Sequence, residues 1–372
     1  MKIREVRATP VRVRRSPRFL PKTAHGEVTA SEYVILEVET DEGLTGLGEV
    51  TCSPRWSGEE AAGTVTLVRD HLNPALCGLD PWNWAAIAGR LKTVFGARPF
   101  LRAGIEMACL DAAGREKDLR AVDLLGGAHR EEIATKFVLP GRETAVVRDM
   151  ARDLRSFGVP VVKVKVGMGA DDDISRVAAV REELGSGVRL TVDANEGWQP
   201  EEAHIALAGL AACGVDAVEQ PLARSAWRAS AALRARTSAA LVGDESIWTL
   251  ADVTTAAQTG AFDLVSIYPG KCGGLRSTAV LAEAATASGL GVTFGSNLEL
   301  GIGAAALAHA IAAAPVVSPV VPADLIGPLY FESSLITDDS FVGWGSAVLP
   351  SGPGLGVELD REALAEYRMD GG

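Results

Sequence analysis

The sequence has few aromatic residues, few cysteines and no long apolar run. Aromatic residues make up 5% of the 372 residues, and the five cysteines are scattered without a CxxC pair. This cysteine pattern indicates neither a disulfide framework nor a zinc site. The Ala-rich stretch 301–314 is too short for a membrane span and contains His309. Since the N-terminus also has no apolar signal region, we expect a cytoplasmic protein that does not contact a membrane.

The chain also lacks positive net charge. It has 36 Lys and Arg residues against 48 Asp and Glu residues, for a formal charge of −12. Such a surface repels phosphate backbones, which excludes nucleic acid as an expected partner. A small anion can still bind in a pocket that contains lysines and a metal ion. The hydrophobic fraction of 47% is enough for a large core and more than one domain.

The first third of the chain groups strand patterns before helical patterns. Residues 2–14 alternate as a strand does, and 32–50 resemble a hairpin that turns at Asp41-Glu42-Gly43. Helical patterns follow at 58–76, 83–94 and 101–117. Grouped strands followed by grouped helices predict an α+β capping domain over residues 1–125.

Eight short strand candidates follow, most of them separated by Ala-rich helical patterns. They are TKFVL, VVKVKVG, RLTVDAN, DAVEQP, ALVGDES, DLVSIYP, GVTFGSN and VVPADLIG. Eight is the number of strands in a (β/α)₈ barrel. We therefore predict an α/β fold, with a TIM barrel over residues 126–345 and a tail, 346–372, that returns to the capping domain.

A polar residue recurs near the end of seven of these strands. The intervals between them are 25 to 28 residues, the length of one βα unit, which places the seven on one rim. They are Lys165, Asp193, Glu219, Asp244, Lys271, Ser296 and Asp324.

Lys163 and Lys165 alternate with valines in VKVKV. Because side chains alternate along a strand, both lysines point to one face, which we expect to be the barrel interior. Two inward ammonium groups are costly unless anions or a reaction justify them. Their proximity should lower at least one of the two pKa values and provide a base near neutral pH. The alternative is an edge strand whose lysines lie in water.

Asp193, Glu219 and Asp244 end three successive strands. Any one of them alone could cap the helix that follows. Three carboxylates that converge on one rim repel each other unless a cation joins them. Hard oxygen ligands without His or Cys favour Mg²⁺, with Mn²⁺ possible, over zinc. We therefore predict that the three residues bind one divalent metal ion.

Lys271 follows the sixth strand in SIYPGKCGGL. By itself it could be an ordinary loop lysine flanked by glycines. With Lys165 across the barrel, it instead offers a second acid/base group on the other side of a bound substrate.

The ordered motifs KxK, VDAN, VEQP, GDES and KxGG, together with AVDLLGG at 121–127 and the PGLGVELD ending, resemble the enolase superfamily. The resemblance is to its muconate-lactonizing-enzyme-like group, within the mandelate racemase/muconate lactonizing enzyme family, and it covers most of the chain. It implies a small carboxylate substrate whose α-proton is removed or returned through an enediolate. It also implies that Lys165 is the base or acid on one face, Lys271 its counterpart on the other, and that Lys163 stabilises the enolate. A homo-oligomer, either a dimer or an octamer, is typical of the group.

Further site residues are expected around this centre. Glu245, beside Asp244, is expected to support the site from behind or to cap a helix, and Glu299 is expected to take a similar supporting position. The cap loops 16–29 and 51–58 offer Arg18, Lys22, Arg55 and Trp56, which either meet the substrate or lie in solvent. The residues expected to contact substrate are Asn195, Tyr268, Ser296, Asn297 and Asp324.

Two departures from relatives bear on the substrate. No histidine lies at a barrel strand end, so the histidine base of mandelate-racemase-like members is absent. The Asp-x-Asp pair by which dipeptide epimerases hold an ammonium group is reduced to Asp324, with Ile326 two residues later. One carboxylate could still pair with a single amine, as in a proline derivative.

We rank cycloisomerisation or racemisation/epimerisation above dehydration of a hydroxy acid or a hydroxyproline-type substrate. A non-catalytic barrel would have lost a metal ligand or an acid/base lysine, and this sequence retains all of these residues. A metal-assisted hydrolase normally needs histidine ligands at the strand ends.

Overall fold

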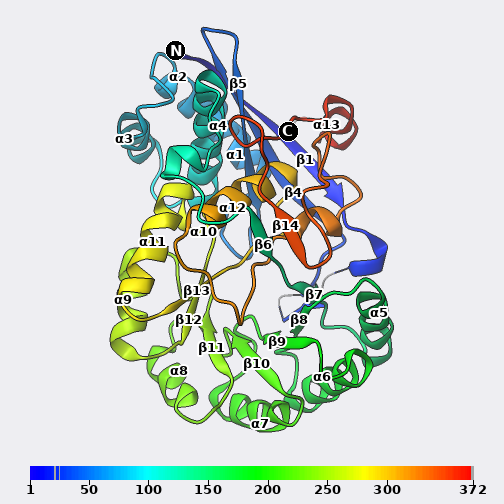
Figure 1. Ribbon diagram of the computed structural model, residues 1–372. Coiled ribbons are helices and arrows are strands. Elements are labelled where there is room, and N and C mark those ends of the chain that lie inside the picture. The colour runs from blue at the N-terminus through cyan, green and yellow to red at the C-terminus, as the bar shows by residue number, and fades with distance from the viewer. Residues whose placement is uncertain (21, 25, 370–372) are drawn as a thin grey trace.

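The computed structural model describes residues 1–20, 22–24 and 26–369. A capping domain lies above a barrel, and Figure 1 shows the two in contact along the carboxyl ends of the barrel strands. The cap contains an antiparallel sheet in the order β1-β4-β5, formed by Ile3–Arg14, Ala30–Thr40 and Thr45–Cys52. The hairpin predicted over 32–50 is confirmed, and its turn uses Gly43 at φ 81°.

Helices cover this sheet, as the grouped patterns predicted. They are α1 (Ala61–Leu67), a π-helical turn (Val68–Leu72), α2 (Asn73–Leu76), α3 (Trp84–Val94) and α4 (Pro99–Lys117). Two 3₁₀ turns, Pro17–Phe19 and Asp123–Leu125, and a small hairpin of β2 (Lys22–Thr23) and β3 (Gly26–Glu27) complete the cap. Helix α4 lies against β5 so closely that a Cβ atom on Gly48 would be 2.1 Å from the carbonyl oxygen of Gly104. Glycine is therefore required where these two elements touch.

Seven parallel strands form the barrel wall in consecutive order. They are β7 (Phe137–Leu139), β8 (Val161–Lys165), β9 (Arg189–Asp193), β10 (Val215–Glu219), β11 (Ala240–Gly243), β12 (Leu264–Ile267) and β13 (Gly291–Phe294). The flanking helices are α5 (Thr144–Ser156), α6 (Ala170–Leu184), α7 (Pro200–Ala211), α8 (Trp227–Arg234), α9 (Leu250–Thr259), α11 (Leu275–Ala287) and α12 (Gly301–Ala313), with the short α10 (Pro269–Cys272) after β12.

The eighth predicted strand is present as a closing segment that makes one β-bridge, from Thr135 to Ala323, and is not a full strand. The amide of Asp324 donates to the Phe294 carbonyl at 2.8 Å, on the β13 side. On the β7 side, the amide of Lys136 donates to the Ala323 carbonyl at 3.0 Å. The barrel therefore closes, but Pro322 has no N–H to donate, which shortens the ladder.

The tail returns to the cap, as expected. It begins with β14 (Ser346–Val348), which pairs with β6 (Glu132–Ala134), after the 3₁₀ turn Gly327–Tyr330. It ends in α13 (Arg361–Tyr367), which lies beside β1 in Figure 1. The division at residues 125 and 345 stays a prediction.

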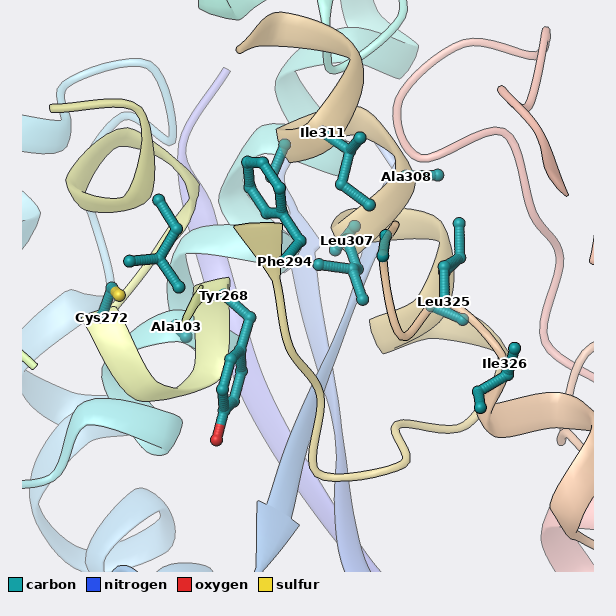
Figure 2. Close-up of a cluster of buried hydrophobic side chains, with 14 of the residues drawn as sticks. Ala103, Tyr268, Cys272, Phe294, Leu307, Ala308, Ile311, Leu325 and Ile326 are labelled. Atoms are coloured by element: carbon teal, nitrogen blue, oxygen red, sulfur yellow. The ribbon is translucent and has the colours of Figure 1, made fainter. Parts of the chain in front are cut away.

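Cap and barrel share one hydrophobic core. Figure 2 shows Ala103 of α4 beside Tyr268 and Cys272, in a cluster that extends to side chains of β13, α12 and the closing segment, and the Tyr268 hydroxyl points away from the other labelled groups. In the part of the chain that the structure describes, no helix is long and apolar enough to cross a membrane.

Candidate functional site

A cavity of about 220 Å³ lies between the barrel mouth and the cap. From the barrel strand ends it is lined by Lys163, Lys165, Asp193, Glu219 and Asp244, among others. Active sites of β/α barrels lie at this end. The cavity thus brings together six of the seven residues that the strand-end spacing had singled out, all except Lys271.

Lys163 and Lys165 both point into the barrel, as the alternation in β8 predicts. The Lys163 ammonium donates to Glu219 Oε2 at 3.0 Å and to Asp324 Oδ2 at 2.6 Å. The Lys165 ammonium donates to Asp193 Oδ2 at 2.5 Å. Burial favours a lower pKa for Lys163, but Asp324, Glu219 and Asp193 raise that pKa well above its ordinary value. Lys163 is therefore not the lysine with a lowered pKa, because the surrounding carboxylates outweigh its burial.

The three predicted metal ligands lie on adjacent strands. In the pairing of β9 with β10, Asp193 is the partner of Glu219, and Asp244 comes directly after β11. All three are buried. Burial raises the pKa of Glu219 to about 7; Lys163 opposes this shift, and the neighbouring carboxylates add to it. Part of this rise comes from Asp193, Asp244 and Asp324, so several carboxylates gather around Glu219.

The fit of a metal ion depends on the oxygens of these three residues. Among the described residues, no group of three or more His, Cys, Asp or Glu side chains is arranged closely enough to hold a metal ion. Each carboxylate contacts a lysine instead: Lys165 for Asp193, Lys163 for Glu219 and Lys271 for Asp244. Even so, the site has three carboxylate donors on adjacent strands, and the neighbouring carboxylates repel that of Glu219. Such a set of donors is chemically suited to a hard divalent cation. Such a cation would compete with the lysines for the same oxygens.

Lys271 lies behind the cavity wall. Its ammonium donates to Asp244 Oδ1 at 2.5 Å and to the main-chain oxygens of Asp244 and Ser266 at 2.7 and 2.8 Å. It also lies 5.0 Å from the centre of the Tyr268 ring. Neither Lys271 nor Tyr268 is among the described residues that line the cavity. Tyr268, predicted to contact substrate, is in a supporting position because it is buried against Trp56 and Phe100.

Asn195 connects Lys165 to the buried Glu245. Its side-chain oxygen accepts from the Lys165 ammonium at 2.9 Å, and its amide donates to Glu245 Oε1 at 3.0 Å. Asn195 lines the cavity in the left-handed conformation, at φ 44°, which Asn tolerates better than most residues. Glu245 therefore lies behind the site, where the sequence had placed it.

Gln220 is a site residue that the sequence reasoning missed. Its side-chain oxygen accepts from the amides of Asp244 and Ser246, at 2.9 and 3.2 Å. It thereby fixes the turn that presents the Asp244 carboxylate. The VEQP motif contained this residue, but only the fold shows that it reaches the next strand.

The loop after β13 supplies Ser296 and Asn297 to the cavity wall. Glu299 is buried and accepts from the Asn297 amide at 3.1 Å, in the supporting position that was predicted for it. Glu49 of the cap accepts from the amides of Leu300 and Gly303, at 2.7 and 2.9 Å, at the start of α12. The sequence did not reveal this role of Glu49, because its partners are more than 250 residues away.

Asp324 lines the cavity, but lysines occupy its carboxylate. Lys163 donates to Asp324 Oδ2, and the ammonium of Lys136, a fully buried lysine that the sequence reasoning did not single out, lies 3.1 Å from Asp324 Oδ1. This arrangement does not favour the expectation that Asp324 pairs with a substrate amine, because two ammonium groups already balance its charge.

The cap loops divide into two groups. Arg55 and Trp56 line the cavity, and Trp56 packs on Trp248 with ring centres 4.6 Å apart. Arg18 and Lys22 instead reach the barrel's outer side, where they pair with Asp153 and Glu143 at 2.6 and 3.7 Å. Arg15, at the end of the first cap strand, also lines the cavity and was not predicted.

The comparisons with known proteins cover nearly the whole chain. Residues 3–126 match the mandelate racemase / muconate lactonizing enzyme N-terminal domain, and residues 145–363 match the enolase C-terminal domain-like family. The chain is 32% identical to a chloromuconate cycloisomerase of Cupriavidus pinatubonensis, over 90% of each chain. It is 29% identical to an N-succinyl-L-Arg/Lys racemase of Bacillus cereus, over 93% of each.

Among solved structures, a dipeptide epimerase from Enterococcus faecalis V583, complexed with Mg and the dipeptide L-Leu-L-Tyr, superposes with a TM-score of 0.89. It is 29% identical, and the match covers 96% of this chain and 100% of that one. These relatives are isomerases of the enolase superfamily. The chain therefore belongs to the mandelate racemase/muconate lactonizing enzyme family of that superfamily, in its muconate-lactonizing-enzyme-like group.

Proposed function

We propose that this enzyme removes or returns the proton α to the carboxylate of a small substrate, through an enediolate. The observation that carries the proposal is the position of Lys165, whose ammonium contacts Asp193 in the wall of the cavity that Glu219 and Asp244 also line. A lysine at a barrel mouth can hold or accept a proton at the face of a bound substrate.

The surrounding residues support this role. Asn195 orients the Lys165 ammonium through one hydrogen bond and is itself held by Glu245. Lys163, which stays cationic between Glu219 and Asp324, supplies positive charge to an enolate oxygen. Ser296 and Asn297 add polar groups on the β13 side of the cavity.

We propose Mg²⁺ as the cofactor, with Mn²⁺ as a second possibility, held by Asp193, Glu219 and Asp244. When bound, the cation would balance the second negative charge that develops on the substrate carboxylate. The carboxylate-only donor set supports this assignment. So does the Mg present in the related dipeptide epimerase.

The outcome we favour is cycloisomerisation or racemisation/epimerisation. Lys165 lines the cavity, whereas Lys271 lies behind Asp244. Proton delivery from one face is sufficient for cycloisomerisation. Racemisation also requires the Lys271 ammonium to reach the opposite face once the Asp244 carboxylate no longer holds it. Dehydration of a hydroxy acid or hydroxyproline-type substrate by the same first step is the alternative.

A screen of small carboxylates in D₂O with added Mg²⁺, followed by mass spectrometry, tests the proposal. We expect one deuterium at the carbon α to the carboxylate in any compound that reacts. Hydrolysis without exchange would contradict the enolate mechanism, and exchange that persists at the wild-type rate in a Lys165→Met variant would contradict the role assigned to Lys165.

We further propose that the enzyme works in the cytoplasm as a homo-oligomer, either a dimer or an octamer. All five cysteines are free, which fits a reducing compartment. The oligomeric state follows from the family resemblance and is measurable by light scattering coupled to gel filtration.

A further inference from the structure

One fully enclosed lysine has no part in the proposed reaction so far. Lys136 directly precedes β7, and its side chain is not exposed to solvent. Its ammonium donates to the Pro322 carbonyl at 2.5 Å and forms an ion pair with Asp324 Oδ1 at 3.1 Å. Lys136 is not among the described residues that line the cavity, so it does not touch a substrate there. Burying such a charge is costly unless an anion balances it.

Asp324 connects Lys136 to the cavity. Its Oδ1 faces Lys136, and its Oδ2 accepts from the Lys163 ammonium at 2.6 Å. A hydrogen bond of 2.8 Å from the Asp324 amide to the Phe294 carbonyl fixes its main chain. The carboxylate therefore bridges an enclosed ammonium and an ammonium in the cavity wall.

Lys136 and Asp324 stabilise each other's charge. Burial alone would raise the pKa of Asp324, but Lys136, and after it Lys163, brings that pKa below its ordinary value. Burial lowers the pKa of Lys136, and Asp324 opposes that shift. Without Lys136, the Asp324 carboxylate would depend on Lys163 alone for its counter-charge.

Three carboxylates of the described residues lie within ion-pair distance of the Lys163 ammonium. Asp324 is the nearest at 2.6 Å, followed by Glu219 at 3.0 Å and Asp193 at 3.5 Å. An Asp324 carboxylate without a second partner would bind this ammonium more strongly and cancel more of its charge. Lys136 opposes this effect, because it attracts the same carboxylate from the other side.

We propose that Lys136 is a positioning residue: it balances Asp324 from behind, so that Asp324 holds the Lys163 ammonium in the cavity wall without cancelling its positive charge. This inference rests on the proposed function, because it takes Lys163 as the group that meets an enolate oxygen. Enolate charge develops after the substrate has bound. Loss of Lys136 should therefore slow the chemical step more than it weakens substrate binding.

Lys136→Met tests the proposal with any carboxylate that the wild-type enzyme turns over in D₂O. We expect kcat to fall about 10–100-fold, the usual effect of an outer-shell partner, whereas KM should change less than about threefold. The double variant, Lys136→Met with Asp324→Asn, should recover most of the lost kcat. It has no unbalanced carboxylate, and the asparagine oxygen can still accept from Lys163.

Leu154→Ala is the matched control for a loss of stability. Leu154 is fully buried on α5, which lies outside the barrel wall in Figure 1, and it is not among the described residues that line the cavity. Its truncation destabilises the core without changing a charge. We expect an unchanged kcat, with circular dichroism to verify that each variant is folded at the assay temperature.

Titration with Mg²⁺ alone gives a readout that does not depend on turnover. Lys136→Met removes a positive charge near Asp193 and Glu219, so the Kd for Mg²⁺ should equal the wild-type value or lie below it. A general loosening of the site would raise that Kd instead.

The inference is overturned if Lys136→Met keeps the wild-type kcat, if Leu154→Ala lowers kcat as much, or if Lys136→Met weakens Mg²⁺ binding. If Lys136→Met does not fold, the double variant decides: we expect its kcat within about tenfold of wild type, and a larger loss overturns the inference. Absence of α-exchange by the wild-type enzyme with every carboxylate would instead contradict the proposed function, so the two failures are distinguishable.

Discussion

The Lys271 ammonium donates to two oxygens of Asp244, the side-chain Oδ1 at 2.5 Å and the main-chain carbonyl at 2.7 Å. A third hydrogen bond, to the Ser266 carbonyl, uses the last of its three protons. Asp244 therefore both presents a carboxylate to the cavity and holds a proposed catalytic lysine. A cation that takes Oδ1 of this carboxylate would remove one of the three bonds of Lys271, which would couple cation binding to the freedom of Lys271.

Replacing Asp193 with Asn should weaken Mg²⁺ binding at least tenfold, because an amide oxygen carries no formal charge. Titration calorimetry of the purified enzyme measures this change. Asp216→Asn is the control, since Asp216 is exposed near the start of β10, away from the cavity. Unaltered Mg²⁺ affinity in the Asp193 variant would mean that the proposed ligand set is wrong.

Lys165→Ala should abolish deuterium exchange on one face of the substrate while Mg²⁺ still binds. The expected loss in rate is about 10²–10⁴-fold, the usual contribution of a positioned acid or base. NMR of the product formed in D₂O reports which face exchanges. Lys117→Ala, at an exposed position beside Glu116, should leave the rate unchanged. Exchange at the wild-type rate on both faces would exclude the assigned role.

The strand-end residues were predictable because the βα period places them on one rim whatever the details of the loops. The barrel, the cap hairpin and the returning tail were also predicted from patterns in the sequence. The eighth strand was predicted too long because Pro322 interrupts its ladder. The pKa of Lys163 could not be predicted from its neighbour Lys165 alone, since the opposing carboxylates come from three other segments.

Lys136, Glu49 and Arg15 were missed for a common reason. Lys136 pairs with Asp324, almost 190 residues later, and Glu49 caps a helix more than 250 residues away. Each lies in a strand or next to one, where a charged residue normally faces water. Only the tertiary arrangement shows that these side chains are enclosed.

Lys136→Met should lower the free energy of unfolding by about 3–5 kcal/mol, because it removes one partner of a buried ion pair and leaves Asp324 with Lys163 alone. Urea unfolding followed by circular dichroism measures the change. Lys22→Met, which breaks an exposed pair with Glu143 at 3.7 Å, should cost less than about 1 kcal/mol. Equal effects of the two substitutions would refute the structural role of Lys136.

His309 should make the protein less stable as the pH falls. It is buried within α12, where Nδ1 accepts from the Val122 amide at 3.2 Å and Nε2 lies 3.2 Å from the Leu355 carbonyl. Burial lowers its pKa from 6.5 to about 4. Between these values the unfolded chain binds a proton that the folded chain does not, so the contribution is fully present above pH 6.5 and is lost towards pH 4.

The expected loss is at most about 1.4 kcal/mol per pH unit over that window. His309→Gln removes the titrating group while keeping a donor and an acceptor. We therefore expect urea unfolding at pH 7 and pH 5 to show a wild-type stability that falls more steeply than that of the variant. Parallel changes in the two proteins would mean that His309 does not titrate differently in the folded and unfolded states.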